Sequence, residues 1–522
     1  RSGGQGFHVD DEGDLHIEDS KVIEAHKLIE KKIPNDAIRI LPLASETGTL
    51  IHQYDENSFR LYELPVPNYG EVTGIIGKNG IGKSTAVQII AGVIEPNLGN
   101  FEMGPASDDE LIEHFKGTEA QRFLERQRDG EVDIAYKPQR VELIPKKYDG
   151  NCDGLLQSVN EQSNTFKDDV IEALSLEKIL DRDVSNISGG ELQRLAIAAT
   201  LLKDANVYVL DEPTSYLDIK QRLRMSKFLR SLPDEETNIM VIEHDLIILD
   251  HMTDTVHLMY GEEGSYGIVS GKKSTKAGIN TYLDGYLQSE NVKFRESSIS
   301  FEKRSTVKSK KRDTLTTWPS FEESFGDFDL EADSGVINRK EVIGVLGENG
   351  IGKSSFVKAL AGEKGDHGLD LEVAHKPQYL DPDDGIVRMV IRKAVKNHKH
   401  DLIEPLNLNG LLNAKLQDLS GGELQRVMVA KTLSEDADLY LLDEPSAYLD
   451  VEQRLDVSKA ISGFMENSKK SAIVVDHDLL FLDYLSDRLM VFEGEPAERG
   501  RATGPHSMQE GMNTFLKDIG IT

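Results

Sequence analysis

The chain has 522 residues and a formal net charge of −31, from 60 Lys and Arg against 91 Asp and Glu. This length is several times that of a typical domain of about 150 residues, so we expect two or more domains, and no stretch approaches the roughly 20 apolar residues of a membrane span. The only cysteine, Cys152, excludes an internal disulfide framework and indicates a reducing, cytoplasmic compartment. The acidic balance argues against indiscriminate coating of nucleic acid, but it permits local basic contacts.

The chain contains a tandem duplication. GIIGKNGIGKST at Gly74–Thr85 recurs as GVLGENGIGKSS at Gly344–Ser355, and four further motifs recur in the same order. These four are YKPQ and HKPQ, ending at Gln139 and Gln378; SGGELQR at Ser188–Arg194 and Ser420–Arg426; LDEPTSYLD and LDEPSAYLD at Leu210–Asp218 and Leu442–Asp450; and EHDL and DHDL around His244 and His477. Short apolar runs lead into the motifs and alternate with helical patterns, which predicts two mainly parallel α/β sheets.

The two copies differ in length between the lysine loop and the glutamine. The first copy holds about 31 extra residues there, within roughly 106–131. Apolar residues lie at helical spacing on both sides of Gly117, which predicts a helix-turn-helix hairpin. The pattern leaves open whether this hairpin is structural or docks a partner. Between the copies, KRSTVKSKKR at Lys303–Arg312 is typical of a solvated loop, with RNA contact as the alternative.

Both glycine-rich segments fit the pattern G-x-x-x-x-G-K-[ST] after a predicted strand. In such a loop, backbone N–H groups converge on a phosphate at a helix N-terminus. We expect Lys83 and Lys353 to reach the β- and γ-phosphates of ATP, and the Ser84 and Ser354 hydroxyls to ligate Mg²⁺. The predicted nucleotide-binding residues of the two loops are Asn79, Gly80, Gly82, Lys83, Ser84 and Thr85 in the first copy, and Asn349, Gly350, Gly352, Lys353, Ser354 and Ser355 in the second.

A pair of acidic residues ends one apolar run in each copy. Asp211 and Asp443 come first, at a predicted strand end beside the lysine loop, where a carboxylate holds the metal directly or through water. Glu212 and Glu444 follow, and a carboxylate in this position can orient, or accept a proton from, the water that attacks the γ-phosphate. We therefore predict a magnesium-dependent ATPase with Glu212 and Glu444 as catalytic bases.

Glutamine and histidine complete each predicted catalytic group. Gln139 and Gln378 follow Lys-Pro, and a glutamine there can contact both the metal and the attacking water. His244 and His477 follow buried strands, where an imidazole can hydrogen-bond the γ-phosphate and the water. We predict catalytic roles for all four residues and metal contact for the two glutamines.

The SGGELQR segments form a second type of phosphate-binding turn. Ser188 and Gly190, and likewise Ser420 and Gly422, lie in a serine-glycine nest that opens a predicted helix. If the copies face each other head to tail, each ATP lies between the lysine loop of one copy and the serine-glycine turn of the other. Nucleotide would then close a monomer on itself, and hydrolysis would permit opening.

These motifs are similar to those of ABC-type ATPases. The narrower resemblance is to the ABCE family, the archaeal and eukaryotic ribosome-recycling ATPases also called RNase L inhibitor. It is carried by HQYDENSFRLYELPVPNYGEV at His52–Val72, NGIGKST, the hairpin insertion, DEPTSYLD with QRLR, and INTYLDGYLQSENVKFR at Ile279–Arg295. It implies two tandem ABC-type nucleotide-binding domains of the P-loop NTPase class at 44–280 and 313–503, and hinges at 281–312 and 504–522.

The resemblance also implies partners and an adenine site. Members of the family dock on the small ribosomal subunit, through rRNA and ribosomal proteins, and split the subunits or keep them apart when ATP closes the protein; release or initiation factors are further possible partners. Adenine stacking matches Tyr54 and Phe59, and more loosely Phe325 and Phe328, although core packing explains the last two nearly as well.

The N-terminal segment departs from the family. ABCE proteins begin with two iron-sulfur clusters held by cysteines, the second set spaced C-x2-C-x2-C-x3-C-P. VIEAHKLIEKKIP aligns with this spacing and places Ile23, His26, Ile29 and Ile33 at the ligand positions before Pro34. We therefore expect no iron-sulfur cluster, and a small degenerate ferredoxin-like domain over 1–43 that continues upstream of Arg1.

Two questions stay open from the sequence. The loss of the cluster ligands puts subunit splitting in doubt, so anti-association and hibernation are equally compatible tasks. The alternative from another class is the ATPase motor of an ABC transporter, which would need membrane partners.

Overall fold

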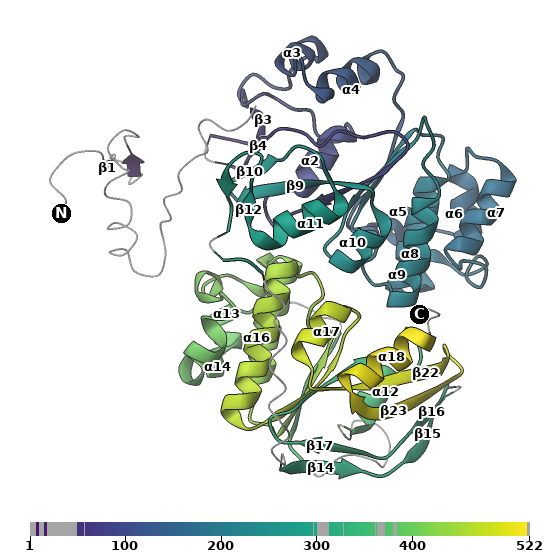
Figure 1. Cartoon of the computed structure of the whole chain (residues 1–522), viewed down its shortest axis with the longest axis vertical. Coiled ribbons are helices and arrows are strands. Elements are labelled where there is room, and N and C mark those ends of the chain that lie inside the picture. The colour runs from purple at the N-terminus through teal and green to yellow at the C-terminus, as the bar shows by residue number, and fades with distance from the viewer. Residues whose placement is uncertain are drawn as a thin grey trace.

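The computed structural model describes residues 7–9, 15–17, 50–56, 58–295, 297–299, 313–326, 328–360, 362, 371–378 and 384–518. Figure 1 shows two lobes stacked on one another, the first formed by residues 50–299 and the second by residues 313–518. Each lobe is built around one large twisted sheet with helices on it, which is the α/β architecture that the duplicated motifs predict.

The first lobe contains a nine-stranded sheet whose main path runs β3-β4-β10-β9-β5-β8-β7-β6, with β11 paired to β9. Its strands β5 to β8 are parallel, and every residue of β5, β7 and β8 is buried, as expected for strands covered on both faces. The strands are β3 (Leu50–Gln53), β4 (Arg60–Tyr62), β5 (Val72–Ile76), β6 (Ile134–Lys137), β7 (Val207–Asp211), β8 (Asn238–Ile242), β9 (Thr255–Glu262), β10 (Tyr266–Val269) and β11 (Lys273–Ser274).

The second lobe repeats this path strand for strand. Its eight-stranded sheet runs β15-β16-β23-β22-β18-β21-β20-β19, so each strand occupies the position of its counterpart in the first lobe. The strands are β15 (Phe321–Phe325), β16 (Phe328–Ala332), β18 (Val342–Leu346), β19 (Val373–Lys376), β20 (Leu439–Asp443), β21 (Ser471–Val475), β22 (Arg488–Glu495) and β23 (Arg499–Ser507). A separate two-stranded sheet pairs β14 (Thr314–Trp318) with β17 (Gly335–Asn338). The tandem α/β fold predicted from the sequence is confirmed.

Helices cover both sheets. The first lobe contains α2 (Lys83–Ile90), α3 (Asp108–His114), α4 (Glu119–Arg128), α5 (Ile144–Lys147), α6 (Cys152–Val159), α7 (Asn164–Ala173), α8 (Gly189–Leu201), α9 (Ile219–Arg230), α10 (Leu246–Met252) and α11 (Thr275–Asp284). The second contains α12 (Lys353–Leu360), α13 (Val387–Val390), α14 (Arg392–Asn397), α15 (Gly421–Leu433), α16 (Val451–Ser468), α17 (Leu479–Leu485) and α18 (Met508–Asp518). In the described part of the chain, no helix combines the length and the apolar composition that a membrane crossing needs.

The extra segment of the first lobe consists of α3 and α4, joined through Gly117. Ser107 and Glu110 form a reciprocal capping box at the start of α3, which satisfies the first free backbone donors of the helix. Phe115 and Phe123 are buried and pack into the core on one side of the sheet. The hairpin is therefore fastened to the lobe by an apolar face, and its acidic residues remain on the surface.

The N-terminal segment contributes two short strands, β1 (Phe7–Val9) and β2 (Leu15–Ile17), paired antiparallel. The predicted ferredoxin-like domain and the four former ligand positions at 23, 26, 29 and 33 otherwise lie outside the described residues. So does the basic segment at 303–312. The joining segment that is described adds β12 (Tyr286–Leu287) and β13 (Val292–Lys293) after α11, and at the other end α18 packs against β22 and β23.

A glycine in each lobe lets the lysine loop lie directly on the sheet. A Cβ at Gly500 of β23 would stand 2.1 Å from the carbonyl oxygen of Ile351, and one at Gly267 of β10 would stand 2.0 Å from that of Ile81. These contacts are with backbone, so the side chain has no flexible neighbour to displace. The close approach positions the loop relative to the sheet in both lobes.

We expect Gly500→Ala to destabilise the second lobe by about 1–3 kcal/mol through overpacking, and to weaken ATP binding there because the loop must shift. Urea unfolding and a nucleotide titration of the full chain measure the two effects. Gly410→Ala is the matched control, because a Cβ at Gly410 meets no atom within 4 Å. Equal stability of the Gly500→Ala and Gly410→Ala variants would contradict the role of the close approach.

Candidate functional site

The lysine loops lie between the first central strand and the first helix of each lobe. Gly80 and Gly82 have φ values of 71° and 86°, in the left-handed region that favours glycine. The Lys83 ammonium lies inside the loop and donates to the carbonyl oxygens of Gly77 and Lys78, at 3.0 and 2.5 Å. The lysine side chain thus lies within the loop and binds two of its backbone carbonyl oxygens.

The second lysine loop repeats this geometry. Lys353 donates to the carbonyl oxygens of Gly347 and Glu348 at 2.9 and 2.5 Å. Burial lowers the pKa of Lys353 to about 8, and nearby carboxylates, Asp218 of the first lobe foremost, oppose that shift. Burial likewise lowers the pKa of Lys83, opposed mainly by Asp450 of the second lobe. The pKa of each lysine is therefore influenced by a carboxylate of the other lobe.

Oxygen ligands suited to Mg²⁺ stand beside both loops. In the second lobe, the Ser354 hydroxyl donates to Asp443 Oδ2 at 2.8 Å. In the first lobe, both carboxylate oxygens of Asp211 are buried without a hydrogen-bond partner in the part of the chain that the structure describes. Burial, and next the charge of Glu212, raise the pKa of Asp211 to about 6. A buried carboxylate of this kind is suited to a cation.

The number of candidate protein ligands also fits Mg²⁺. Among the described residues, no group of three His, Cys, Asp or Glu side chains comes together as a metal site. Mg²⁺ usually binds through one or two protein oxygens and completes its shell with phosphate oxygens and water. One serine hydroxyl and one aspartate in each lobe match this pattern.

Glutamine, glutamate and histidine meet at the end of the central strands in each lobe. Gln139 donates to Glu212 Oε1 at 2.8 Å, and His244 Nε2 lies 3.6 Å from the same oxygen. In the second lobe, Gln378 donates to Glu444 Oε1 at 2.6 Å, and His477 Nε2 lies 3.5 Å away. The structure therefore brings together the three side chains that the sequence predicts to act on the attacking water.

The electrostatic surroundings of the two glutamates differ. Burial would raise the pKa of Glu212, but the hydrogen bond and charge of His244, with Gln139 and Lys83, hold it well below its ordinary value. Burial, then Asp476 and Asp443, raise the pKa of Glu444 to about 7. Burial, and next the Lys353 charge, hold the pKa of His477 well below its ordinary value. The pKa values of the two glutamates are thus shifted in opposite directions, although their positions correspond.

Two further polar side chains bind the backbone at each glutamate, and we did not predict their roles from the sequence. Lys137 at the end of β6 donates to the carbonyl oxygen of Asp211 at 2.8 Å, and Gln193 of α8 donates to that of Glu212 at 2.6 Å. Their counterparts Lys376 and Gln425 donate to the carbonyl oxygens of Asp443 and Glu444, at 2.9 and 2.5 Å. All four are buried and recur in both copies of YKPQ/HKPQ and SGGELQR, which was the available signal.

These bonds support an unusual backbone conformation. Glu212 and Glu444 both have a φ of 47°, which is in the left-handed region although neither is glycine. Such residues persist where surrounding contacts hold them, and they cluster at functional sites. The lysine and glutamine bonds to the carbonyls before and at each glutamate are contacts of this kind.

The four aromatic residues predicted to meet adenine fall into two groups. The Phe59 and Phe328 rings lie against Gly82 and Gly352 of the lysine loops, so close that a Cβ on either glycine would stand 2.3 or 2.6 Å from a ring carbon. Tyr54 is exposed, and its hydroxyl lies 3.1 Å from Thr85 Oγ1. Phe325 is half-buried and pairs with Phe328 across the β15–β16 hairpin. Tyr54 therefore presents the most open ring beside a loop.

The lobes meet through reciprocal contacts between a lysine loop and the segment after the acidic pair. The Asn79 backbone N–H donates to Asp450 Oδ2 at 2.8 Å, and the Asn349 N–H donates to Asp218 Oδ2 at 2.9 Å. Ion pairs flank both contacts, from Lys78 to Glu452 at 2.7 Å and from Lys220 to Glu348 at 2.6 Å. The two halves are thus arranged head to tail.

The serine-glycine turns predicted from the sequence open α8 and α15. Ser188 and Ser420 accept from the backbone of Glu191 and Glu423 and cap α8 and α15. The carboxyl of Glu263 stands against Gly80 of the first lysine loop, and Arg426 and Glu423 of α15 are the next influences on its pKa after burial, which raises it. The serine-glycine turn of the second lobe therefore lies near the lysine loop of the first.

A cavity lies between the two catalytic groups. It has a volume of about 70 Å³, and its lining includes Glu212, His244, Glu444 and His477. The hydroxyls of Tyr216 and Tyr448 meet at 2.5 Å on its wall. Both glutamates are thus reached from one shared space, and the two tyrosines join the lobes beside it.

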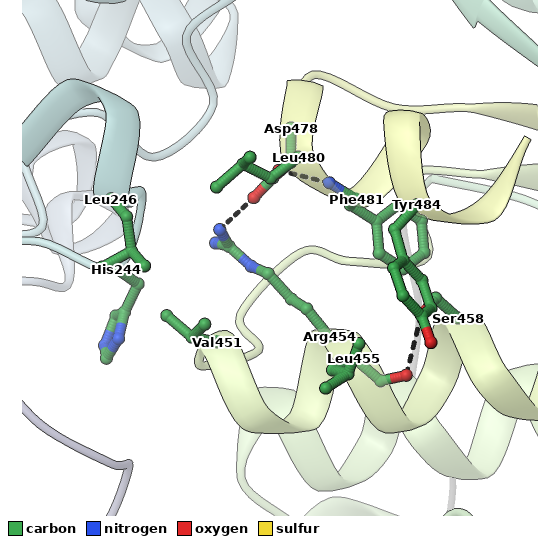
Figure 2. A pocket seen from close by; sticks show the side chains of 10 residues that line it. All are labelled: His244, Leu246, Val451, Arg454, Leu455, Ser458, Asp478, Leu480, Phe481 and Tyr484. Atoms are coloured by element: carbon green, nitrogen blue, oxygen red, sulfur yellow. Dashed lines mark hydrogen bonds and ion pairs between the residues drawn. The ribbon is translucent and has the colours of Figure 1, made fainter. Parts of the chain in front are cut away.

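An ion pair within each lobe lies beside this cavity. Arg222 pairs with Asp245 at 2.9 Å in the first lobe, and Arg454 pairs with Asp478 in the second. Figure 2 shows His244 and Leu246 of the first lobe facing Val451 and Arg454 at the start of α16, with Arg454 directed at Asp478. The interface places a basic and an acidic side chain from each lobe next to the histidines.

The joining segment reaches the same interface through Arg295. Its guanidinium donates to the Tyr282 carbonyl oxygen at 2.6 Å and lies over the rings of Tyr282 and Phe294, at 4.8 and 5.7 Å from the centroids. Arg295 Nε lies 3.7 Å from Glu452, which also pairs with Lys78 of the first lysine loop. The segment between the lobes is therefore linked to a nucleotide loop through one carboxylate.

Known proteins resemble the chain over nearly all of its length. The family model described as ABC transporter matches residues 67–215 and 330–447. An uncharacterized ABC transporter ATP-binding protein of Methanocaldococcus jannaschii is 46% identical over 505 residues, which are 94% of this chain and 83% of that protein.

Two solved structures match the whole architecture. An archaeal ribosome recycling factor, aABCE1, in complex with the archaeal ribosomal stalk protein aP1, has 49% identity and a TM-score of 0.84 over 91% of this chain and 93% of its own. A model of ribosome-bound archaeal Pelota and ABCE1 has 46% identity and a TM-score of 0.92 over 100% of this chain and 89% of that chain.

Replacing both glutamates of the catalytic groups, Glu212→Gln and Glu444→Gln, should lower the ATP turnover rate by about 10²–10⁴-fold, the usual contribution of a general base. ATP affinity should change little, because glutamine keeps the size of each side chain and removes only the proton-accepting carboxylate. Phosphate release and equilibrium nucleotide binding measure the two quantities. Glu113→Gln on the exposed surface of α3 is the control, and wild-type turnover in the double variant would contradict the base assignment.

Proposed function

The chain belongs to the ABCE family of twin ABC ATPases and hydrolyses ATP, and from this premise we propose that it acts on ribosomes. It binds the small subunit and uses nucleotide-driven closure to control whether the large subunit is joined. Support comes from the solved relatives, one an archaeal ribosome recycling factor in complex with a ribosomal stalk protein and the other ribosome-bound with Pelota. rRNA and ribosomal proteins are then its partners, and the cytoplasm is its place of action.

The observation that carries the proposal is the reciprocal contact of the lysine loops with the opposite lobe. Because Asn79 and Asn349 each bind an aspartate of the other half, nucleotide in either loop adjusts the lobe contact directly. A ligand shifts an equilibrium only through differential interaction with its two states. ATP held between a lysine loop and an opposite serine-glycine turn stabilises the closed state alone.

The residues of each nucleotide site have different roles. Lys83 and Lys353 neutralise phosphate charge, and Ser188 with Gly190, and Ser420 with Gly422, grip the phosphates from the opposite lobe. Tyr54, with Phe59 beneath the loop, and Phe325 and Phe328 form the adenine side. The residues that would hold Mg²⁺ are Ser84, Gln139 and Asp211 in the first site and Ser354, Gln378 and Asp443 in the second; the ion supplies charge stabilisation on the phosphate oxygens.

Hydrolysis depends on the glutamine-glutamate-histidine group. Glu212 accepts a proton from the attacking water, while Gln139 and His244 orient that water against the γ-phosphate; Glu444, Gln378 and His477 do the same in the second site. With the β–γ bond broken, the γ-phosphate no longer connects the two lobes. The lobes then separate, and the joining segment moves with them through Arg295 and Glu452.

The transporter-motor alternative draws on the family description and on the name of one relative. Two solved structures that match over nine-tenths or more of the chain carry ribosomal names instead. We therefore retain the ribosomal function as the proposal. Splitting, anti-association and hibernation are tasks that this one mechanism can serve.

The proposal also includes the absence of an iron-sulfur cluster in the N-terminal segment. The sequence has Ile, His, Ile and Ile at the aligned ligand positions 23, 26, 29 and 33. Its only cysteine, Cys152, is buried at the start of α6 in the first lobe. A cluster bound by thiolates needs cysteines that this segment does not supply.

The ribosomal proposal predicts nucleotide-dependent association with archaeal small ribosomal subunits in a sucrose gradient. The Glu212→Gln/Glu444→Gln variant with Mg-ATP should sediment with the subunit, because it stays closed, and the wild type without nucleotide should not. The Lys83→Ala/Lys353→Ala variant is the control, since it loses the phosphate contact. Equal sedimentation with and without ATP, or none in either case, would overturn the proposal.

The cluster-free proposal predicts fewer than about one iron per chain, and no broad visible absorption band, after anaerobic purification from an iron-replete host. Elemental analysis of iron and acid-labile sulfide measures this directly. An ABCE protein that retains its eight cysteines, prepared in parallel, shows that the procedure preserves clusters. About four irons per chain would show that the segment binds a cluster through other ligands.

A further inference from the structure

One surface of the second lobe is basic in a chain that is strongly acidic overall. Between Asp384 and Asp401 the sequence holds no acidic residue, but it holds five lysines and arginines. We call this surface the basic face and define it as Arg388, Arg392, Lys393, Lys396 and Lys399. Figure 1 shows its helices, α13 and α14, at the outer edge of the second lobe beside α16.

The basic face is open and largely unpaired. All five residues of the basic face are exposed. Lys399 lies 4.0 Å from Glu404, but the other four cations make no ion pair with any residue that the structure describes. Their positive potential is therefore not cancelled locally, unlike that of Arg222 or Arg454 at the lobe contact.

The duplication supplies an internal comparison for this charge. An isolated bridge closes the same part of both lobes, from Asn151 to Asp183 in the first and from Ile386 to Lys415 in the second. The bridged segment has three lysines and arginines against eight acidic residues in the first lobe, but six against two in the second. Because both lobes fold in the same way, the fold does not require the positive charge.

The spacing of the cations fits a polyphosphate. Arg388, Arg392 and Lys396 follow one another at intervals of four residues along α13 and α14. Ile391 interrupts the helical backbone between α13 and α14, so the helical spacing applies within α14. Four residues of helix rise about 6 Å, so Arg392 and Lys396 lie on one side of α14, and Lys393 lies next to them. One nucleic-acid strand carries a phosphate about every 3.4 Å along the duplex axis. Cations this close together can contact neighbouring phosphates of one strand.

We propose that the basic face binds the phosphate backbone of RNA. The inference deepens the proposed function, in which rRNA is a partner, because it assigns RNA contact to this surface of the second lobe. The binding itself needs neither an intact ribosome nor nucleotide hydrolysis. A membrane surface is a poorer fit, because among the described residues there only Ile386 and Met389 expose large apolar side chains, at 45% and 68%. An acidic polypeptide does not offer the regular charge spacing of a phosphate backbone.

The test measures binding of the full chain to a fluorescent 20-base-pair RNA duplex of arbitrary sequence over a range of NaCl concentrations. Each phosphate contact contributes about 0.9 to the slope of log K against log salt concentration. The Arg388→Gln/Arg392→Gln/Lys396→Gln variant should lose about 2 to 3 from this slope and at least about tenfold in affinity at low salt. The control Lys146→Gln/Lys147→Gln/Lys203→Gln removes three exposed lysines of the first lobe and should leave both values unchanged.

Wild-type ATP turnover in both variants shows that each is folded. A wild-type slope in the Arg388 variant, or an equal loss in the control, overturns the inference. So does stronger competition by polyglutamate than by unlabelled RNA, or binding to phosphatidylserine vesicles in place of RNA. Association with small subunits is scored separately: RNA binding without it refutes only the ribosomal proposal, and the reverse result refutes only the basic face.

Discussion

Two aspartates connect the halves of this protein, and the remaining arrangement depends on them. Oδ1 of Asp218 accepts from the backbone of Gln221 and caps α9, while its Oδ2 accepts from Asn349 in the other lobe. Asp450 does the same for α16 and for Asn79. One carboxylate thus fixes a helix start in its own lobe and a nucleotide loop in the other. Because the contact is reciprocal, neither nucleotide loop can move without disturbing the lobe contact.

The duplication gives the two sites the same geometry but not the same chemistry. Distances within the glutamine-glutamate-histidine groups agree to about 0.2 Å, since they are 2.8 and 3.6 Å in one lobe and 2.6 and 3.5 Å in the other. The carboxylates differ, because His244 and Lys83 favour the charged form of Glu212 whereas burial and Asp476 disfavour that of Glu444. The two groups therefore share their geometry but differ in the charges that surround the glutamate.

Much of the fold and of the nucleotide site follows from the sequence. Apolar runs ending in a glycine loop or an acidic pair predict β5, β7, β18 and β20, because buried parallel strands need continuous apolar residues. Parallel strands end at the same edge of a sheet, so Glu212, Gln139 and His244 could be expected to meet. These expectations follow from short segments of the sequence and do not require the tertiary structure.

What could not be predicted requires the tertiary arrangement. Lys137 and Gln193 belong to recognised motifs, but their bonds to backbone carbonyls appear only once the helix lies on the sheet. The link from Arg295 through Glu452 to Lys78 joins residues far apart in the chain. The sequence shows that Phe59 and Tyr54 are both aromatic, but it does not distinguish their positions. In the structure, Phe59 packs closely against Gly82 beneath the loop, whereas the Tyr54 ring is exposed.

The central claim is that nucleotide holds the two lobes together. The most direct measurement is the distance between spin labels on Lys227→Cys of α9 and Lys459→Cys of α16, by double electron–electron resonance in a Cys152→Ala background. With Mg-ATP and both catalytic glutamates replaced by glutamine, the account predicts one narrow distance distribution. Without nucleotide it predicts a broader distribution at longer distances. The same distribution in both conditions would contradict the account.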